Sequence, residues 1–446
     1  MVFDALALAQ AFAQGQADPV GTLEAALLRA FAAPEVFIET TVERARREAR
    51  AAHERLIAGQ PLSVLDGVPI AWKDLFDMRG TRTTAGAQVR RQGEPALRDA
   101  ALVNTLTRAG LVNLGKTNLS ELAYSGLGLN PHFGTPSLPC GDQPTRAPGG
   151  SSSGSAIAVA TGIVPLAMGT DTAGSIRIPA AFNGLIGYRA SRQRYAMQGV
   201  FPLARSLDAL GPLAHSVRDV LALDQLLSGA QTSPPLPLPG LRLRVDTAVL
   251  RDPRVEPAVR NNLMAALERL RTAGVLVEQR PVAALQACLA LIEKHGWLGS
   301  AEAFTLHQHL LDGPEAERLD PRVRKRLEAA RHVPASTQLM LSQAAEDLRE
   351  QLRDELNGAL LVTPTVGHVA PPLGPLLEDD ELFARTNLAT LRLTMPGSLL
   401  DMPGVAMPSG KDNQGLHTSL LLAAPSGQDT DLLRAALAIE PLVRNH

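Results

Sequence analysis

Charged and apolar residues are interleaved at helical spacing near the start of the chain. In Glu39–Leu56 the apolar positions recur with the period of an amphipathic helix. We expect two or three such helices over residues 1–60, which are ended by the Gly59-Gln60-Pro61 segment.

Short apolar runs then indicate β-strands. Gly67–Ala71 and Leu111–Leu114 have the length and composition of buried strands, and a helix at about Ala100–Ala109 precedes the second. Residues 141–155 are rich in Gly, Ser and Pro and predict a loop that leads into a small-residue helix, Ser155–Thr161.

A proline-rich segment, Ser233–Pro239, predicts a rigid surface connector. After it, Leu241–Val245 is patterned as a strand, Val259–Thr272 as a helix and Val275–Glu278 as a strand. Two strands joined through a helix are typical of a β-α-β unit with a parallel pairing.

Helical patterns dominate from about residue 283 to 357, and Gly358–Thr363 predicts one more buried strand, closed by Pro364. Strands and helices therefore alternate along the whole chain. That alternation favours the α/β class, with a single sheet flanked by helices on both faces.

Composition and charge narrow the kinds of partner. The 446 residues are 45% hydrophobic with a formal net charge of −2, which is typical of a globular protein with a large core. Such a chain has no positive field to attract nucleic acid or an anionic membrane surface. We expect a small-molecule substrate and neither of those partners.

The two cysteines, Cys140 and Cys288, exclude a disulfide framework and a cysteine-rich zinc site, and they fit a reducing compartment. The first residues lack the basic segment of a secretory signal. Residues 147–170 carry no charge, but they contain Pro165 and many Gly and Ser residues, so we interpret them as buried backbone. The expected location is the cytoplasm.

Two short motifs match known functional patterns, but the residues around them do not favour the structure that each pattern requires. Gly110–Thr117 fits the phosphate-binding pattern G-x-x-x-x-G-K-T, yet its inner residues favour a strand and a helix precedes it, the reverse of the required order. Gly150–Gly154 fits G-x-S-x-G around Ser152, but Pro144 and Pro148 exclude the buried strand that a nucleophile elbow needs. Nucleotide binding remains a weak alternative, which loss of ATP binding in Lys116→Ala would support.

A third motif carries more weight. Gly169–Pro179 places Ser175 after a turn of small residues, which let consecutive amides point toward one spot. Such a nest beside a serine is what an oxyanion hole requires. By itself, this run is also compatible with an ordinary tight turn.

Two segments upstream of Ser175 favour a catalytic role for this serine over an ordinary turn. Gly149–Ser155 contains Ser151, 24 residues before Ser175, and Lys73-Asp74 follows Gly67–Ile70. Together these segments resemble the amidase signature family, strongly over about residues 60–220. Further landmarks match in order, and the last two weakly: Gly115–Asn118 with Glu121, Asn130–Gly134, Ser206–Pro212, Pro408–Gly410 and Gln428-Asp429.

The resemblance implies a Ser-cisSer-Lys triad. Its pattern falls on Ser175 as nucleophile, on Ser151 as proton relay in a cis peptide after Gly150, and on Lys73 as base. The assignment is chemically sensible because a serine hydroxyl needs a base, and a buried lysine is neutral enough to be one. An arginine would stay protonated.

The resemblance also implies an oxyanion site at the amides of Thr172, Ala173, Gly174 and Ser175. Ser152, Asp171 and Arg177 are expected to support the loop rather than touch substrate. No metal or organic cofactor is implied. Three features depart from the family pattern: Ala173 where glycine is usual, Ser153 where glycine is commoner, and the segment Tyr188–Ser191.

The implied fold is one large mixed sheet with helices on both faces, in a single domain over residues 1–446. We divide it into N-terminal helices (1–60), a signature core (61–225), a variable pocket region (226–385) and a C-terminal part of the core (386–446). The implied activity is hydrolysis of a carboxamide in a small amide or urea-like compound. Homodimers are frequent in the family, and the sequence leaves the oligomeric state open.

A rival interpretation has the same chemistry. The signature region is also similar to the glutaminase component of a tRNA-dependent amidotransferase, which works only with partner subunits. A degenerate, non-catalytic scaffold is a further alternative, which the presence of all three triad residues disfavours.

Overall fold

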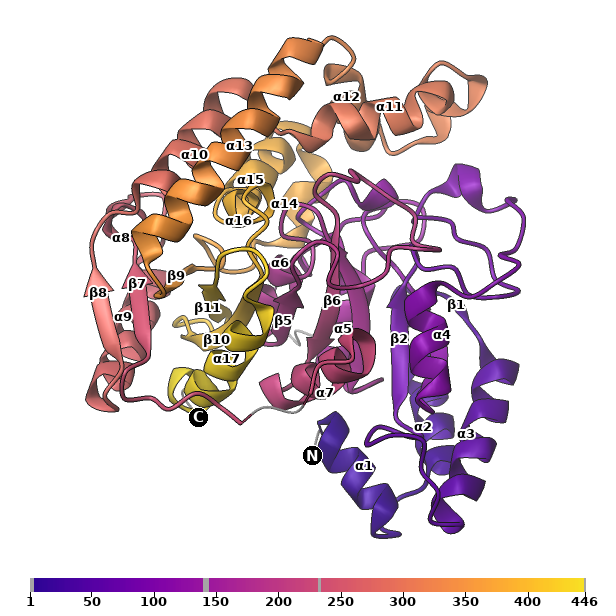
Figure 1. Cartoon of the computed structure of the whole chain (residues 1–446). Helices are drawn as coiled ribbons and strands as arrows, with labels where there is room; N and C mark the ends of the chain where they lie inside the picture. The colour runs from indigo at the N-terminus through magenta and orange to yellow at the C-terminus, as the bar shows by residue number, and fades with distance from the viewer. Residues whose placement is uncertain (1–3, 139–143, 232–233, 445–446) are drawn as a thin grey trace.

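A computed structural model of the chain describes residues 4–138, 144–231 and 234–444. Its described strands form one sheet of 11 strands, in the spatial order β1-β3-β2-β4-β6-β5-β10-β11-β9-β7-β8, which runs from right to left in Figure 1. The strands are β1 (Phe37–Thr40), β2 (Pro69–Lys73), β3 (Val112–Thr117), β4 (Leu166–Asp171), β5 (Ile186–Arg189), β6 (Ala209–Ala214), β7 (Arg242–Val245), β8 (Leu276–Gln279), β9 (Leu360–Pro364), β10 (Gly404–Lys411) and β11 (His417–Ala423).

Helices join and cover these strands. They are α1 (Ala5–Ala13), α2 (Pro19–Phe31), α3 (Val42–Ile57), α4 (Ala101–Arg108), α5 (Ser153–Ala160), α6 (Arg177–Phe182), α7 (Val217–Ser228), α8 (Thr247–Arg251), α9 (Pro257–Thr272), α10 (Ala283–His295), α11 (Gly299–Leu311), α12 (Pro321–Ala329), α13 (Ala335–Leu356), α14 (Leu373–Glu378), α15 (Asp380–Leu391), α16 (Met395–Leu399) and α17 (Asp429–Val443). Short 3₁₀ turns, η1 (Gln88–Arg90), η2 (Glu121–Ala123) and η3 (Pro314–Arg318), complete the set.

The sheet is mixed. Strand β2 is parallel to both of its neighbours, β3 and β4, whereas β4 and β6 are antiparallel. At the other end, β7 is parallel to β8 and β9. The prediction of an α/β protein with one large mixed sheet and helices on both faces is confirmed.

Both faces of the sheet are apolar because successive residues of each strand enter different clusters. Ile70 and Trp72 of β2 pack with residues of α4, α7, α9 and α17, whereas Ala71 between them packs with residues of α5 on the opposite face. Leu243 and Val245 of β7 join the same cluster as Ile70, so one continuous core extends under most of the sheet.

The predicted β-α-β unit is present. Strand β7, helix α9 and strand β8 follow one another, and β7 and β8 pair in parallel. The connector before them has no helix or strand over residues 234–240; Ser233 lies outside the described residues. The predicted strand near residue 360 is β9, and it includes Pro364 instead of ending before it.

One helix begins later than the sequence predicts. The pattern predicts a helix from Glu39, but Phe37–Thr40 form strand β1, and α3 begins at Val42. Strand β1 pairs antiparallel with β3, with Phe37 opposite Thr117. The backbone partner that β3 offers at the sheet edge outweighs local helical spacing in this short segment.

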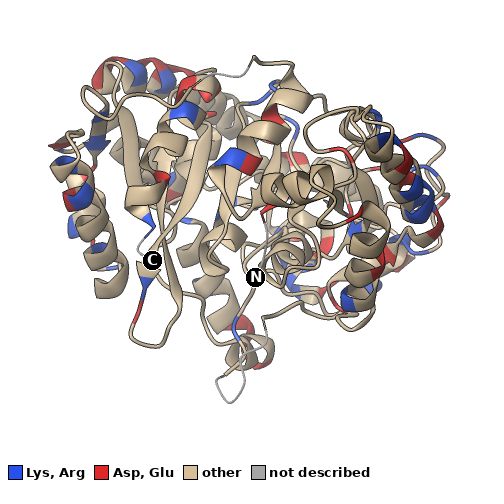
Figure 2. Ribbon diagram, turned by 90° about the horizontal axis from the view of Figure 1, so that it is seen from below, with Lys and Arg blue, Asp and Glu red and all other residues tan. Residues whose placement is uncertain are grey.

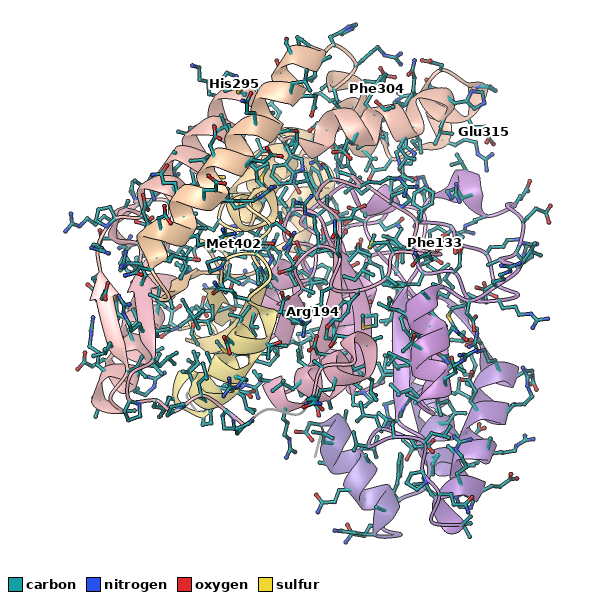
Figure 3. The ribbon with its side chains drawn as sticks, viewed as in Figure 1. Phe133, Arg194, His295, Phe304, Glu315 and Met402 are labelled. Atoms are coloured by element: carbon teal, nitrogen blue, oxygen red, sulfur yellow. The ribbon has the colours of Figure 1, made fainter. Side chains whose placement is uncertain are left out.

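Helices α11 and α12, with the adjoining ends of α10 and α13, form a cap above the strand ends, and α10 and α13 continue down beside β7 and β9 (Figure 1). In Figure 3, His295 and Phe304 mark this cap at the top of the molecule, with Met402 below it. Figure 2 shows acidic and basic residues mixed along the outer helices, while the strands are mostly uncharged. No helix within the described ranges has the length and apolar character needed to cross a bilayer.

Candidate active site

The loop after β4 is shaped by one buried carboxylate. The Asp171 side chain accepts hydrogen bonds from the backbone amides of Gly174 (2.8 Å) and Ile176 (3.1 Å). Arg177 donates to the same carboxylate through Nε (3.0 Å) and Nη2 (2.8 Å). The chain is thereby folded back on itself, with Ser175 at the bend.

Asp171 and Arg177 are fully buried and form an ion pair, and Arg189 lies 3.8 Å from the same carboxylate. Although burial alone raises the pKa of Asp171, the two arginines and the amide donors lower it to about 2. Asp171 therefore stays ionised at neutral pH. Both side chains bond the loop after β4 to itself, and their role as supporting residues that do not touch substrate stays a prediction.

Gly174 cannot be exchanged for another residue without strain. Its φ of +135° is unfavourable for a side chain, and a Cβ there would lie 2.2 Å from Thr394 Oγ1. Thr394 Oγ1 instead donates to the carbonyl of Ala173 at 2.6 Å. Ala173 is not among the described residues with positive φ, so alanine fits this position without the restriction considered above.

The amides of the loop differ in availability. The Gly174 N–H already donates to Asp171. No acceptor is present for the N–H groups of Thr172, Ala173 and Ser175 among the described residues. Of the four predicted oxyanion donors, these three are the ones free to bind a ligand atom.

Lys73 is the last residue of β2, which is parallel to β4. Because parallel strands end at the same edge of a sheet, Lys73 comes close to the end of β4. Its Nζ lies 2.7 Å from Ser151 Oγ and 2.8 Å from Thr170 Oγ1. Asp74 does not pair with it; that carboxylate pairs with Lys116 at 2.6 Å.

The ammonium form of Lys73 is disfavoured by its surroundings. The side chain is completely buried, and desolvation lowers its pKa to about 7, opposed by the negative charges of Asp171 and Asp208. A substantial fraction of Lys73 is therefore neutral at physiological pH and can accept a proton.

The serine-rich segment delivers two hydroxyls to this point. The Gly150–Ser151 peptide bond is cis, as expected from the sequence. Ser152 Oγ donates to the carbonyl of Thr170 at 3.3 Å, and its amide donates to the carbonyl of Ser175 at 3.2 Å. Ser151 thus contacts Lys73, while Ser152 ties its segment to the loop after β4.

Ser175 opens onto a cavity of about 690 Å³. Thr172 and Ala173 line it beside the serine, together with residues of α10, α12 and α15. Among the described residues, no hydrogen bond is formed by Ser175 Oγ. The hydroxyl is therefore free to meet a ligand in the cavity.

The phosphate-loop motif does not form a phosphate-binding loop; its residues form the buried strand β3, as the sequence predicts. Lys116 lies in strand β3 and is completely buried, with Asp74, the carbonyl of Arg82 and Thr83 Oγ1 as its partners. A lysine so enclosed cannot reach a nucleotide phosphate. The G-x-S-x-G motif likewise follows no strand within residues 144–152.

Several residues at the site were not predicted. Thr170 and Asp208 are part of it: Thr170 accepts from Lys73, and Asp208 accepts from Thr172 Oγ1 at 2.6 Å. Asp208 lies in Ser206–Pro212, which the sequence had marked as a family landmark without a role. The cavity residues of α10, α12 and α15 could not be predicted, because they belong to helices whose spacing of polar and apolar residues is that of any amphipathic helix.

Comparisons with known proteins show the family to which the chain belongs. The family model described as Amidase matches residues 22–433. The 2-amino-5-chloromuconic acid deaminase of Comamonas testosteroni is 34% identical over 409 residues, 90% of this chain and 87% of that protein. A glutamyl-tRNA(Gln) amidotransferase subunit of Chloroflexus aggregans is 30% identical over 475 residues, 98% of this chain and 95% of that protein. A crystal structure of an amidase superposes with a TM-score of 0.88 at 32% identity, over 99% of this chain and 100% of that one.

Proposed function

The chain belongs to the amidase family of amide-hydrolysing enzymes, and on this premise we propose that it cleaves a carboxamide with Ser175 as nucleophile, Ser151 as proton relay and Lys73 as base. The observation that carries the proposal is the 2.7 Å contact between Lys73 Nζ and Ser151 Oγ in a site that desolvates the lysine. A base with a pKa near neutrality is matched to its task at physiological pH.

The first half of the reaction acylates the enzyme. Ser175 Oγ attacks the amide carbonyl carbon as its proton passes to Ser151, whose own proton passes to Lys73 Nζ. The tetrahedral oxyanion accepts hydrogen bonds from the free amides of Thr172, Ala173 and Ser175. Lys73 then returns the proton through Ser151 to the leaving nitrogen, the C–N bond breaks, and ammonia or an amine departs.

The second half regenerates the serine. Water attacks the acyl ester and gives up a proton to the Ser151–Lys73 pair, and the Ser175 oxygen takes a proton back as the carboxylic acid leaves. No metal or organic cofactor takes part in this sequence. The Ser175 hydroxyl makes no hydrogen bond among the described residues, and in this mechanism it turns toward Ser151 for the relay.

We propose a small amide or urea-like compound as substrate. The cavity above Ser175 has the size of a small-molecule site, and apolar and polar side chains of the 226–385 region wall it together with residues of the signature core and of the C-terminal part. The polypeptide is expected to act on a free small molecule, with no nucleic acid or membrane partner.

The test is ammonia release across a panel of small amides by the purified wild-type chain and by Ser175→Ala. This variant removes only a hydroxyl without hydrogen-bond partners, so its fold is expected to persist. We expect turnover of at least one amide by wild type and none above background by the variant. Equal release by both proteins would contradict the proposal.

A second candidate function is supported by the match to the glutamyl-tRNA(Gln) amidotransferase component, which extends over 98% of this chain. Under that alternative, the chain would release ammonia from glutamine, and only in the presence of partner subunits. Turnover of a simple amide by the isolated chain excludes this alternative, whereas activity restricted to glutamine and to an added complex would establish it.

A further inference from the structure

A second buried carboxylate lies at the strand ends that carry the proposed base. Asp208 immediately precedes strand β6, whose first residue, Ala209, pairs with Asp171 at the end of β4. Lys73 ends β2, the strand on the other side of β4. These three neighbouring strands therefore place Asp208, Asp171 and Lys73 at the same end of the sheet.

The Asp208 carboxylate is enclosed and accepts hydrogen bonds through both oxygens. Only 6% of the residue is exposed. Oδ1 accepts from Thr172 Oγ1 at 2.6 Å, and Oδ2 accepts from the backbone amides of Leu203 at 2.9 Å and Ala204 at 3.1 Å. Burial raises the pKa of Asp208, as does Glu302 on α11, whereas these three donors lower it because they stabilise the ionised form.

No cation neutralises Asp208 by direct contact. Asp171 has an arginine partner at 2.8 Å, but Asp208 forms no ion pair in the part of the chain that the structure describes. Two arginines instead bond to the backbone just before it: Arg189 Nη2 donates to the carbonyl of the preceding residue at 3.4 Å, and Arg192 Nη1 to the carbonyl before that. The negative charge of Asp208 is therefore not offset by a partner of its own.

This charge bears on Lys73, which changes its protonation state during the proposed reaction. Lys73 is neutral when it acts as the base and cationic once it holds the proton from Ser151. Burial lowers the pKa of Lys73, and the negative charges of Asp171 and Asp208 oppose that effect. Of these two carboxylates, Asp171 is paired with arginine and Asp208 is not.

Asp208 also contacts the proposed oxyanion turn. Thr172 is the first residue after β4, and its N–H is one of the three loop amides without an acceptor among the described residues. Thr172 is 2% exposed, and its hydroxyl is held by Asp208 Oδ1. Because the hydroxyl is attached to Cβ, fixing it restricts χ1 and with it the backbone of Thr172 at the start of the turn.

Resting on the proposed amidase function, we propose that Asp208 is a positioning residue of the reaction, which holds Thr172 in the oxyanion turn and stabilises Lys73 electrostatically while the lysine carries the proton. Asp208 is not among the described residues that line the cavity, so it acts through these two neighbours and not on the substrate. The lysine cation and the oxyanion develop in the same step, and a fixed carboxylate and a fixed amide are both in place before it.

The test measures the rate at which a fluorophosphonate labels Ser175 between about pH 5 and 9, an assay that does not require the substrate to be known. Asp208→Asn keeps an oxygen that can accept from Thr172 but removes the charge. We expect the acid limb, the fall in rate below neutral pH, to move to lower pH by roughly one pH unit, because Lys73 holds its proton less strongly. A purely structural role would lower the rate without moving the limb, and a limb at the wild-type position overturns the inference.

Thr172→Val separates the hydrogen bond from the charge. It removes the hydroxyl that Asp208 holds, while the amides of Leu203 and Ala204 still bind the carboxylate. We expect the acid limb to stay at the wild-type position and the labelling rate above it to fall by roughly tenfold or more, since a displaced oxyanion donor stabilises the transition state less well. An undiminished rate overturns the positioning of Thr172 by Asp208.

Asp219→Asn is the matched control for the loss of a buried carboxylate. Asp219 is fully buried and accepts from the amides of Ala5 and Leu6, both at 3.0 Å. It is on α7, which packs against α1 at the end of the molecule opposite the cap (Figure 1). Its acid limb should match that of wild type, and an equal shift there overturns the inference. If Asp208→Asn fails to fold, Asp208→Ser, which is equally uncharged, replaces it.

The inference and the proposed function fail differently. If labelling of Ser175 depends on Lys73 but the acid limb is the same in wild type and Asp208→Asn, the proposed function stands and the role of Asp208 falls. If the label on wild type misses Ser175, or if its rate does not depend on Lys73, the proposed function itself is contradicted.

Discussion

Lys73 and Ser151 are 78 residues apart in the chain, yet Lys73 Nζ and Ser151 Oγ are 2.7 Å apart in a fully buried site. Lys73 is the last residue of strand β2, so it lies at the carboxyl end of that strand. The segment before α5 places Ser151 next to it. Since Asp74 pairs with Lys116, no carboxylate forms an ion pair with Lys73 in the described chain. The amine is held by hydroxyl and carbonyl oxygens that accept hydrogen bonds from either protonation state.

The pH dependence of activity follows from this arrangement. The proposed base works only when unprotonated, and burial lowers the pKa of Lys73 to about 7. We expect kcat/KM to fall below neutral pH with an apparent pKa near that value and to level off on the alkaline side. An acid limb near the ordinary pKa of lysine, 10.5, would contradict a neutral lysine base.

The free energy of unfolding tests the lowered pKa of Lys73 independently of catalysis. Its pKa is depressed on folding, so the unfolded chain binds more protons between about pH 7 and the unfolded value of 10.5. The penalty is complete below the folded pKa and disappears as pH rises to the unfolded one. We expect Lys73→Met to be more stable than wild type at pH 7 in urea unfolding, by an amount on the order of a few kcal/mol.

The same comparison at higher pH supplies its control. The advantage of Lys73→Met over wild type should shrink steadily toward about pH 10. A constant difference across this range would show that packing or lost hydrogen bonds, and not the ionisation of Lys73, cause the change in the free energy of unfolding.

Alanine substitutions should distinguish the roles of Ser151 and Ser152. Ser151→Ala removes the hydroxyl in contact with Lys73 and should lower kcat by roughly 10²–10⁴-fold. Ser152→Ala removes one hydrogen bond to the Thr170 carbonyl and should cost less than about tenfold. Steady-state kinetics on the same amide decide between them, and the opposite ranking would move the relay to Ser152.

The neighbouring residues Ala173 and Gly174 differ in backbone conformation, so substitutions at them should differ in effect. In Gly174→Ala the new Cβ would lie 2.2 Å from Thr394 Oγ1 at a φ of +135°, so we expect a loss of roughly 3 kcal/mol in the free energy of unfolding, with loss of activity. Ala173→Gly meets neither constraint and should cost roughly 1 kcal/mol or less. Urea unfolding of both variants checks the difference; equal losses would mean that the turn tolerates a side chain at either position.

The sequence predicted the strands and helices that carry strong periodicity, among them the β7-α9-β8 unit. It also predicted a strand over Leu111–Leu114, because Leu and Val in the middle of the phosphate-loop pattern favour extended backbone, and β3 continues that strand through Lys116. It missed β1, since Phe37–Thr40 form a strand through pairing with β3, a partner that lies far away in the chain. Local patterns do not contain such contacts.

The site shows the same division. Ser175, Ser151 and Lys73 were named through family motifs and their spacing, and the structure brings Lys73 to Ser151 and places Ser175 at the cavity. Arg326 and Arg392 could not be singled out, because an arginine on a helix is usually a solvated residue and this chain has many. Their position beside Ser175 comes from the cavity that they line, which the fold assembles from helices far apart in the chain.

The most direct test of the central claim is to label the protein with a fluorophosphonate at neutral pH and locate the adduct by peptide mass spectrometry. We predict a single adduct on Ser175 in wild type, and labelling slowed by several orders of magnitude in Lys73→Met, whose fold the urea-unfolding measurements would check. An adduct on Ser151 or Ser152, or undiminished labelling of Ser175 in Lys73→Met, would contradict the account.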